Sequence, residues 1–478
     1  MDDKKENGEL NLTFERKYAF DIWDEAVTKG AFDFCEGYKE FLNRARSERQ
    51  AVKFIVEAAK NVGFKELEHV GNVKDKGFSF PVYSVNRGKA VVLARPGRQP
   101  VSDGMRIMMA HLDTPHLDLK VRPLYENEHV AFLKTQYYGG IKKYQWTNLP
   151  LAMSGIVARQ DGTTIEVEVG ADPKDPVLMI TDIAPHLDKI QSKEKIDDAI
   201  PAETLNIVLG SIGAKAKDGD KEKEKDAVKK QVLQLLNGKY GIAEEDFVSA
   251  DIELLPAGGA RDLGLDRSMV AAPGQDDRSC AYDILRAFLD AGQPEYCTIA
   301  VFMDKEEIGS QGATSSQSNF FIDFASELLY LETGAHDENV LRDAFSKTKA
   351  VSADTTFAFD PDYPEVFDSL NTARLGAGVA IEKYTGGGGK YSSSEATAEF
   401  VAYIRNVLNA NGIVWQTGGG GKIDIGGGAT ISMYFSRLNM DIVDLSIPVL
   451  SVHAPFEISS KADIYSAYLA YKAFFESK

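Results

Sequence analysis

Two adjacent glutamates, Glu306 and Glu307, follow an apolar segment at residues 298–303 that has the composition of a buried strand. Carboxylates that follow a strand in an α/β enzyme can bind a metal ion or act as a general base. Successive side chains of a strand point to opposite faces, so both glutamates can serve one site only if the backbone leaves the extended conformation. We expect the next two residues, Ile308-Gly309, to provide that turn.

Histidines and further carboxylates end other predicted segments in the same way. His111 and Asp113 follow a strand predicted at residues 106–110 and lie two residues apart, on the same face of an extended segment. That spacing suits a histidine ligand and a carboxylate that either ligates as well or orients the imidazole ring. Three more segments contribute Asp276 and Asp277 before a predicted helix, Asp354 after an apolar pair, and His453 at a predicted strand end.

These residue types together predict a metal site. Histidine and carboxylate ligands suit Zn²⁺, and also Mn²⁺ or Co²⁺, whereas a structural zinc site would use clustered cysteines. If one carboxylate bridges, five ligands can hold two ions, which make water nucleophilic near neutral pH and polarise a carbonyl oxygen. One of the adjacent glutamates would then be a ligand, and the other a base that passes the proton of the water to a leaving amine. We therefore expect metal-assisted hydrolysis of an amide.

Alternating strands and helices must position these residues. Apolar residues at helical spacing predict one or more helices over residues 20–59, and short apolar runs predict the strands that follow them. These strands are expected at 81–86, 90–94 and 106–110. After residue 257 the same alternation predicts strands at 298–303, 375–381 and 447–453. It also predicts helices at 279–289, 321–329, 394–409 and 461–474.

The sequence pattern differs in the stretch between these two groups of strands and helices. Apolar and polar residues alternate there, for example at 164–170, which is typical of antiparallel strands with one exposed face. The sequence thus predicts an α/β catalytic domain made of residues 1–119 and 258–478, interrupted by an inserted β-rich domain at 120–257. Within the insertion, a tract of mixed charge at 215–230 predicts a surface loop that leads into a helix.

Two glycine runs, at residues 385–390 and 417–422, are similar to each other. Neither run has the spacing of a phosphate-binding loop, because the required glycine and the hydroxyl residue after the lysine are missing from both. We expect flexible loops or sites where backbone segments approach closely.

Composition excludes several classes of protein. The chain of 478 residues has 54 Lys and Arg against 72 Asp and Glu, a formal net charge of −18, which disfavours nucleic acid as a partner. Its N-terminus is charged where a secretory signal would be apolar, and its apolar runs are shorter than the roughly 18 residues of a membrane span. The three scattered cysteines fit reduced core thiols. We expect a cytoplasmic enzyme that binds neither nucleic acid nor membrane.

The ordered motifs around these residues resemble those of the M18 family of metallo-aminopeptidases, of which the aspartyl aminopeptidases are the best known. The motifs are Ala-His111-Leu-Asp-Thr-Pro, Gln-Asp276-Asp-Arg-Ser, Asp-Lys-Glu306-Glu307-Ile-Gly-Ser, Ser-Ala-Asp354 and Val-His453. The resemblance covers nearly the whole chain. It implies an α/β, phosphorylase/hydrolase-like zinc-peptidase catalytic domain with an inserted β-rich dimerisation domain, peptide substrates, and a homo-oligomer that is a tetrahedral dodecamer.

The resemblance also implies a role for each site residue. One Zn²⁺ would be held by His111, Asp276 and Asp354, and the other by Asp276, Glu307 and His453, so that Asp276 bridges two ions per subunit. Glu306 would be the general base, and Asp113 would lie behind His111. His186, in the inserted domain, would reach the active site of a neighbouring subunit and contact the substrate or the tetrahedral oxyanion. The other histidines, His69, His116, His129 and His336, have no such context and are expected to be structural.

Three alternatives stay open at this stage. Aspartyl-specific members use a lysine near the first glycine run, where this chain has Glu382-Lys383. If Glu382 lies in the substrate pocket, charge complementarity favours basic or neutral N-terminal residues, and if Lys383 does, acidic ones. A related di-metal enzyme, such as an M42-type peptidase or a deacylase, is a second alternative. The third is a non-catalytic shell protein, whose signature would be a missing ligand or base, and none is missing here.

Overall fold

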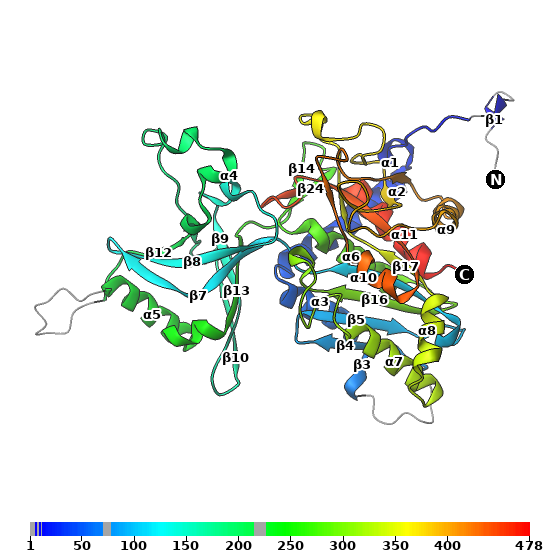
Figure 1. The fold of residues 1–478 in the computed structure, drawn as a ribbon, viewed down its shortest axis with the longest axis horizontal. Helices are drawn as coiled ribbons and strands as arrows, with labels where there is room; N and C mark the ends of the chain where they lie inside the picture. The colour runs from blue at the N-terminus through cyan, green and yellow to red at the C-terminus, as the bar shows by residue number, and fades with distance from the viewer. Residues whose placement is uncertain (1–4, 7–8, 11, 70–77, 215–225) are drawn as a thin grey trace, which may run out of the picture.

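The computed structural model describes residues 5–6, 9–10, 12–69, 78–214 and 226–478. Two sheets, one of thirteen strands and one of seven, lie in separate lobes (Figure 1). Most of the charged tract predicted as a surface loop, residues 215–225, falls outside the described part of the chain. The helix predicted after it is present as α5 (Ala227–Tyr240).

The larger sheet carries the predicted βα alternation. Its strands run in the order β14 (Arg261–Leu263), β15 (Met269–Ala272), β24 (Glu457–Ser460), β23 (Asp441–Leu450), β17 (Lys349–Ser352), β6 (Met105–His111), β16 (Cys297–Met303), β5 (Ala90–Arg95), β4 (Val82–Asn86) and β3 (Lys65–Glu66). The short strands β18 (Thr355–Phe357), β19 (Val379–Glu382) and β21 (Trp415–Thr417) branch from it.

Four neighbouring strands of this sheet, β23, β17, β6 and β16, are parallel. The register pairs Met303 with His111 and Ser352 with Met109, so β16, β6 and β17 end at nearly the same level. Because the carboxyl ends of parallel strands meet at one edge of a sheet, the residues that follow them are brought together.

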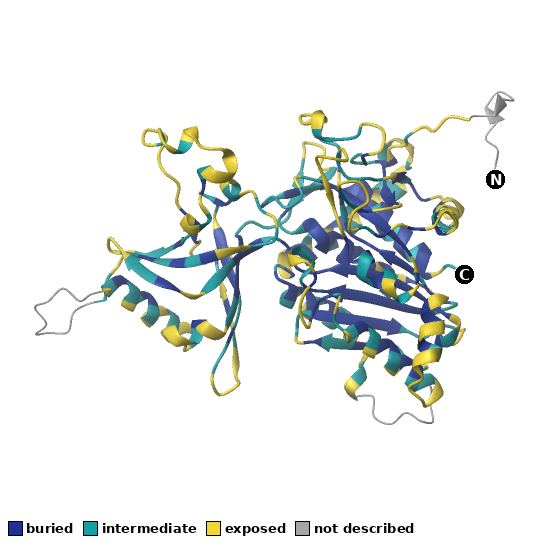
Figure 2. Cartoon of the chain, in the orientation of Figure 1, coloured by how far each residue is buried: buried dark blue, intermediate teal, exposed yellow. Residues whose placement is uncertain are grey.

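Helices cover both faces of this sheet, so its central strands are buried along their whole length (Figure 2). Side chains of β6 alternate between two apolar clusters: Met108 and Ala110 belong to one, Ile107 and Met109 to the other. The first cluster includes α2 (Glu25–Arg44), α3 (Glu48–Asn61), α6 (Gln275–Asp290), α9 (Ala398–Ala410) and α11 (Lys461–Phe475). The second includes α7 (Phe320–Thr333), α8 (Glu338–Ser346) and α10 (Ser432–Phe435).

The smaller sheet is antiparallel throughout, as the alternating pattern predicts. Its order is β10 (Thr164–Val169), β9 (Leu151–Ala158), β13 (Ala250–Pro256), β7 (His116–Asn127), β8 (Val130–Tyr138), β12 (Ile207–Gly210) and β11 (Met179–Ile180). Val228 and Val232 of α5 pack on its buried face. All seven strands fall between His111 and Asp276 in the sequence, so this lobe separates two of the predicted ligands.

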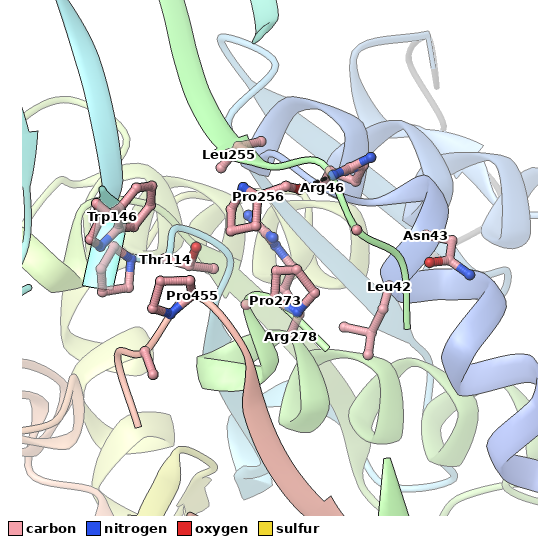
Figure 3. Close-up of a pocket in the computed structure, with 14 residues that line it drawn as sticks. Leu42, Asn43, Arg46, Thr114, Trp146, Leu255, Pro256, Pro273, Arg278 and Pro455 are labelled. Carbon is pink, nitrogen blue, oxygen red and sulfur yellow. Dashed lines mark hydrogen bonds between the residues drawn. The ribbon is translucent and has the colours of Figure 1, made fainter. Parts of the chain in front are cut away.

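Side chains of both lobes pack together where they join. A small pocket of about 20 Å³ lies between Leu42 and Arg46 of the larger lobe and Trp146 and Pro256 of the smaller one, and Figure 3 shows the residues that line it. Arg46 donates a hydrogen bond to the carbonyl oxygen of Pro256. The two lobes are therefore joined by packed side chains as well as by the chain segments that run between them.

Several sequence predictions differ from the structure at their boundaries. The helical stretch at 20–59 is divided into α1 (Ala19–Ile22), α2 and α3, and Ser47 caps α3 together with Gln50. The strand predicted at 447–453 is longer at its start and ends at Leu450, before His453. Cys35, Cys280 and Cys297 are buried free thiols, as expected. Among the described residues, no helix combines the length and apolarity that a membrane crossing requires.

The glycine runs are sites of close backbone approach. Strand β20 (Gly386–Gly387), in the first run, pairs antiparallel with β22 (Gly427–Gly428), which follows the second. A Cβ atom at Gly427 would lie 2.3 Å from the carbonyl oxygen of Gly386, so only glycine fits there. Of the two expectations, close approach is therefore confirmed for the first run.

Candidate metal centre

The predicted ligands converge at the carboxyl edge of the larger sheet. The Nε2 atom of His111 lies 3.6 Å from Oδ1 of Asp276 and 3.6 Å from Oδ1 of Asp354. On the other side of Asp276, Nε2 of His453 lies 3.2 Å from Oδ2 of Asp276 and 3.4 Å from Oε2 of Glu307. Each oxygen of Asp276 therefore faces a different histidine.

These distances fit bound zinc. Nitrogen and oxygen ligands at the usual zinc distances, placed tetrahedrally, are roughly 3.3 Å apart. Oδ1 of Asp276 and Oε1 of Glu307 are buried without a hydrogen-bond partner among the described residues. Because a buried carboxylate oxygen without a donor is costly, these two atoms suit a cation.

The turn that brings both glutamates to the site precedes them. Strand β16 ends at Met303, Lys305 has a positive φ of 71°, and Glu306–Ile308 form a short 3₁₀ helix. The prediction that Ile308-Gly309 provides the turn is therefore wrong, because the strand has already ended when the glutamates begin. On a helical turn, adjacent side chains need not point to opposite faces.

Asp113, which was predicted to lie behind His111, contacts both His111 and the turn that carries the glutamates. Its Oδ1 accepts a hydrogen bond from the amide of Glu306 and its Oδ2 from the amide of Glu307, each at 3.1 Å. The Nδ1 atom of His111 donates to the backbone oxygen of Asp113 at 2.9 Å, which leaves Nε2 of His111 free to face Asp276 and Asp354. Asp113 thus orients a histidine and both glutamates.

A residue that the sequence patterns did not single out, Glu457 of β24, joins two segments of the centre. Its Oε2 accepts hydrogen bonds from the amides of Gln275 and Asp276, and its Oε1 accepts one from the amide of His453. Asp276 has a non-helical backbone at the start of α6, and His453 lies in a turn with a positive φ of 65°. Glu457 therefore connects two irregular segments that are far apart in the chain.

The charges of the centre also favour cations. Burial would raise the pKa of Asp276, but the two histidines outweigh it and hold that pKa well below its usual range. Burial raises the pKa of Glu307 and the pKa of Asp354, and the charge of Asp276 raises both further. Burial also raises the pKa of Glu306 to about 8. Such crowding of buried carboxyl groups is relieved by a divalent cation.

Asp277 offers a second carboxylate near the same place. One oxygen each of Asp277 and Asp354 and one ring nitrogen of His111 lie within 4.8 Å of one another. However, Oδ2 of Asp277 accepts the amide of His111 at 3.2 Å, and burial raises the pKa of Asp277 well above its usual range. Both oxygens of Asp276 instead face histidines, at 3.6 Å and 3.2 Å, so Asp276 fits the position between them better.

A cavity of about 490 Å³ opens onto the centre and is bordered by the glycine runs. Glu382 lines it, whereas Lys383 points elsewhere, with its Nζ 3.7 Å from Glu395. None of the lysines and arginines that the structure describes lines this cavity.

His186 is separate from the centre within one chain. It is exposed in the segment between β11 and α4 (Ile196–Ala199) of the smaller lobe. No hydrogen bond or ion pair joins it to the predicted ligands within the described part of the chain. Its predicted role in a neighbouring subunit stays a prediction.

Comparison with known proteins agrees with this chemistry. Residues 41–475 match the family model of the aminopeptidase I zinc metalloproteases, M18. A probable M18 family aminopeptidase 1 of Clostridium acetobutylicum is 43% identical over 467 residues, 97% of this chain and 99% of that protein. Its counterpart in Thermotoga maritima is 42% identical over 465 residues, covering 97% of this chain and 100% of that protein.

Solved structures agree as well. A crystal structure of an M18 family aminopeptidase from Thermotoga maritima has a TM-score of 0.91 and 42% identity, covering 98% of this chain and 100% of that one. The S. cerevisiae mApe1 dodecamer shares the fold, with a TM-score of 0.74 at 18% identity, over 94% and 97% of the two chains. This chain therefore belongs to the M18 family of zinc metallo-aminopeptidases, enzymes that release N-terminal residues from peptides.

Proposed function

We propose that this aminopeptidase holds two zinc ions, one by His111, Asp276 and Asp354 and the other by Asp276, Glu307 and His453. The observation that carries the proposal is the placement of Asp276, whose two oxygens lie 3.6 Å from His111 and 3.2 Å from His453. A carboxylate between two histidines is placed to bridge two ions. Mn²⁺ or Co²⁺ would accept the same ligands.

Zinc bound there would lower the pKa of a water molecule to roughly 7 and polarise the carbonyl of the scissile bond. The protein residues then move the proton. Glu306 faces the same cavity, with its Oε2 3.9 Å from Nε2 of His111, and its backbone is held by Asp113. In its ionised form Glu306 accepts the proton of the attacking water and donates it to the amine that leaves.

The same fold supports a proposal for the assembly. We propose that residues 120–257 are a dimerisation domain inserted in a phosphorylase/hydrolase-like catalytic domain, and that the chain forms a cytoplasmic, tetrahedral dodecamer in which His186 reaches a neighbouring active site. One relative, S. cerevisiae mApe1, is a dodecamer. The smaller lobe also exposes large apolar side chains, including Leu187 at 75% and Ile190 at 80% of their surface, which a subunit contact would cover.

Native mass spectrometry of the purified enzyme tests both proposals at once. We expect the mass of twelve chains and two zinc ions per chain. A preparation that is fully active with one ion per chain would contradict the two-ion centre, and a stable active monomer would contradict the assembly.

The position of Glu382 supports a proposal for specificity. Its buried carboxyl group accepts a hydrogen bond from Thr356 and lies near Asp354 and Asp444 without a described cationic partner, and burial raises its pKa to about 8. A basic substrate side chain would supply the missing positive charge, whereas an acidic one would add a repulsion. We therefore propose that basic or neutral N-terminal residues are preferred to acidic ones.

Glu382→Gln is expected to lower kcat/KM for lysyl and arginyl p-nitroanilides about 10-fold relative to the leucyl compound, because a charged hydrogen bond is lost. Lys383→Gln is the matched control and should leave that ratio unchanged. A wild-type enzyme that prefers aspartyl or glutamyl substrates would refute the assignment.

A further inference from the structure

Three consecutive residues of the smaller lobe, Tyr138-Gly139-Gly140, contact the metal centre of the larger lobe. They lie at the end of β8 and just beyond it. Their contacts are made to Asp113, Glu307 and His453, which come from three different segments of the larger lobe. Sequence patterns single out none of the three residues.

Tyr138 contacts the centre through Asp113. Its hydroxyl donates a hydrogen bond to Oδ2 of Asp113 at 2.9 Å, the oxygen that also accepts the amide of Glu307. The ring of Tyr138 stacks on His116, with 4.3 Å between centroids and 15° between planes. His116 is itself buried and held at both nitrogens, by the backbone oxygen of Thr114 and by Asp118. The hydroxyl of Tyr138 is therefore held in a defined position.

Gly139 packs directly against a predicted ligand. A Cβ atom at this position would lie 3.1 Å from Oε2 of Glu307 and 3.3 Å from its Cβ, and the φ of Gly139 is 73°. The backbone thus approaches Glu307 as closely as a residue without a side chain allows. This contact limits the positions open to the Glu307 side chain on that side.

Gly140 determines the tautomer of His453. The Nδ1 atom of His453 donates to the carbonyl oxygen of Gly140 at 2.8 Å, so Nε2 is the nitrogen left to face Asp276 and Glu307. A backbone carbonyl on the outer nitrogen is the usual way in which a ligating histidine is oriented.

We propose that Tyr138-Gly139-Gly140 is a positioning segment through which the smaller lobe sets the geometry of the zinc centre. This inference rests on the proposed ligands and adds that their arrangement depends on the other lobe. Tyr138 acts through Asp113 on the amides of Glu306 and Glu307, Gly139 limits Glu307, and Gly140 orients His453. None of the three touches the reacting atoms through a side chain.

Tyr138→Phe tests the first contact. The variant keeps the ring stacked on His116 and removes only the hydroxyl. We expect a loss of roughly 10-fold or more in zinc affinity, measured by competition with a chelator, and a similar fall in kcat with KM nearly unchanged. The absorption spectrum of the Co²⁺-substituted protein should shift, because the ligand geometry changes. Tyr137→Phe, at the neighbouring half-exposed position, is the matched control.

Gly140→Ala tests the third contact without relying on the first. A Cβ atom there would lie 3.3 Å from Nδ1 of His453, which displaces the ring by a few tenths of an ångström. We expect the same loss of zinc affinity and the same spectral change, with the melting temperature of the zinc-free protein close to that of wild type. Gly238→Ala in α5 is the control, since a Cβ atom there meets no atom within 4 Å beyond its chain neighbours and the backbone of its own helix.

The positioning role is refuted if Tyr138→Phe and Gly140→Ala match their controls in zinc affinity and in the cobalt spectrum. Failure of the ligand assignment looks different. If it is wrong, Asp276→Asn keeps both zinc ions. If only the positioning role is wrong, Asp276→Asn loses zinc while the Tyr138 and Gly140 variants bind it normally.

Discussion

Glu306→Gln is expected to lower kcat by about 100-fold or more while both zinc ions stay bound. Glutamine keeps the size of the side chain but cannot accept a proton from water. The amide of residue 306 still donates to Asp113, so the turn is preserved. Turnover of aminoacyl p-nitroanilides, with zinc measured in the same samples, provides the test. Glu338→Gln, on the exposed surface of α8, is the matched control.

The pH dependence of the wild-type enzyme gives a second readout for the same residue. Burial raises the pKa of Glu306 to about 8, and bound cations, which stabilise the ionised form, bring it lower. Because the base must be ionised, kcat/KM should rise with pH through this pKa, and the acid limb assigned to Glu306 should vanish in Glu306→Gln. Turnover by the variant within a few-fold of wild type would refute the role of Glu306.

Asp276→Asn is expected to remove zinc from both positions and to lower kcat/KM by ~100-fold or more. This loss of activity is larger than the one that usually follows removal of a residue that only hydrogen-bonds to a metal ligand. Asparagine offers one oxygen where Asp276 offers two, and its amide nitrogen does not ligate zinc. His111 and His453 would therefore lose their shared partner. Metal analysis after dialysis at fixed free zinc measures the loss.

Asp277→Asn is the matched comparison, because Asp277 also carries a carboxyl group and is the next residue in the chain. Its carboxyl group accepts the amide of His111, which the amide oxygen of asparagine can also do. We expect this variant to retain both ions. The reverse pattern, with zinc lost from Asp277→Asn and kept in Asp276→Asn, would assign the bridging position to Asp277.

Residue types and periodicity predicted much of the centre because it lies at the ends of parallel strands. His111 ends β6, Asp354 follows β17 and Glu306 follows β16, and these three strands are neighbours in the sheet. The carboxyl ends of such strands meet at one edge whatever the details of packing, so a polar residue placed there is already informative. The resemblance to the M18 family, which the family match confirms, divided the roles among these residues.

Other parts of the site depend on backbone geometry that periodicity does not report. The turn at Lys305 and the turn that carries His453 both use positive φ angles in residues other than glycine, which are disfavoured for such residues and hold only where the surrounding structure stabilises them. Sequence patterns placed the first turn at Ile308-Gly309 and ended a strand at His453. Both predictions failed at a residue whose conformation is decided by its neighbours in space.

The sequence by itself determined the chemistry of the site, the α/β class and the family, because these follow from residue types at strand ends and from ordered motifs. Only the tertiary structure decided which groups hold the predicted ligands in place. Glu457 connects Asp276 to His453, and Tyr138 and Gly140 extend from the other lobe to Asp113 and His453. These contacts join residues far apart in the chain, and no local pattern reports a hydrogen bond that forms only after both lobes have folded.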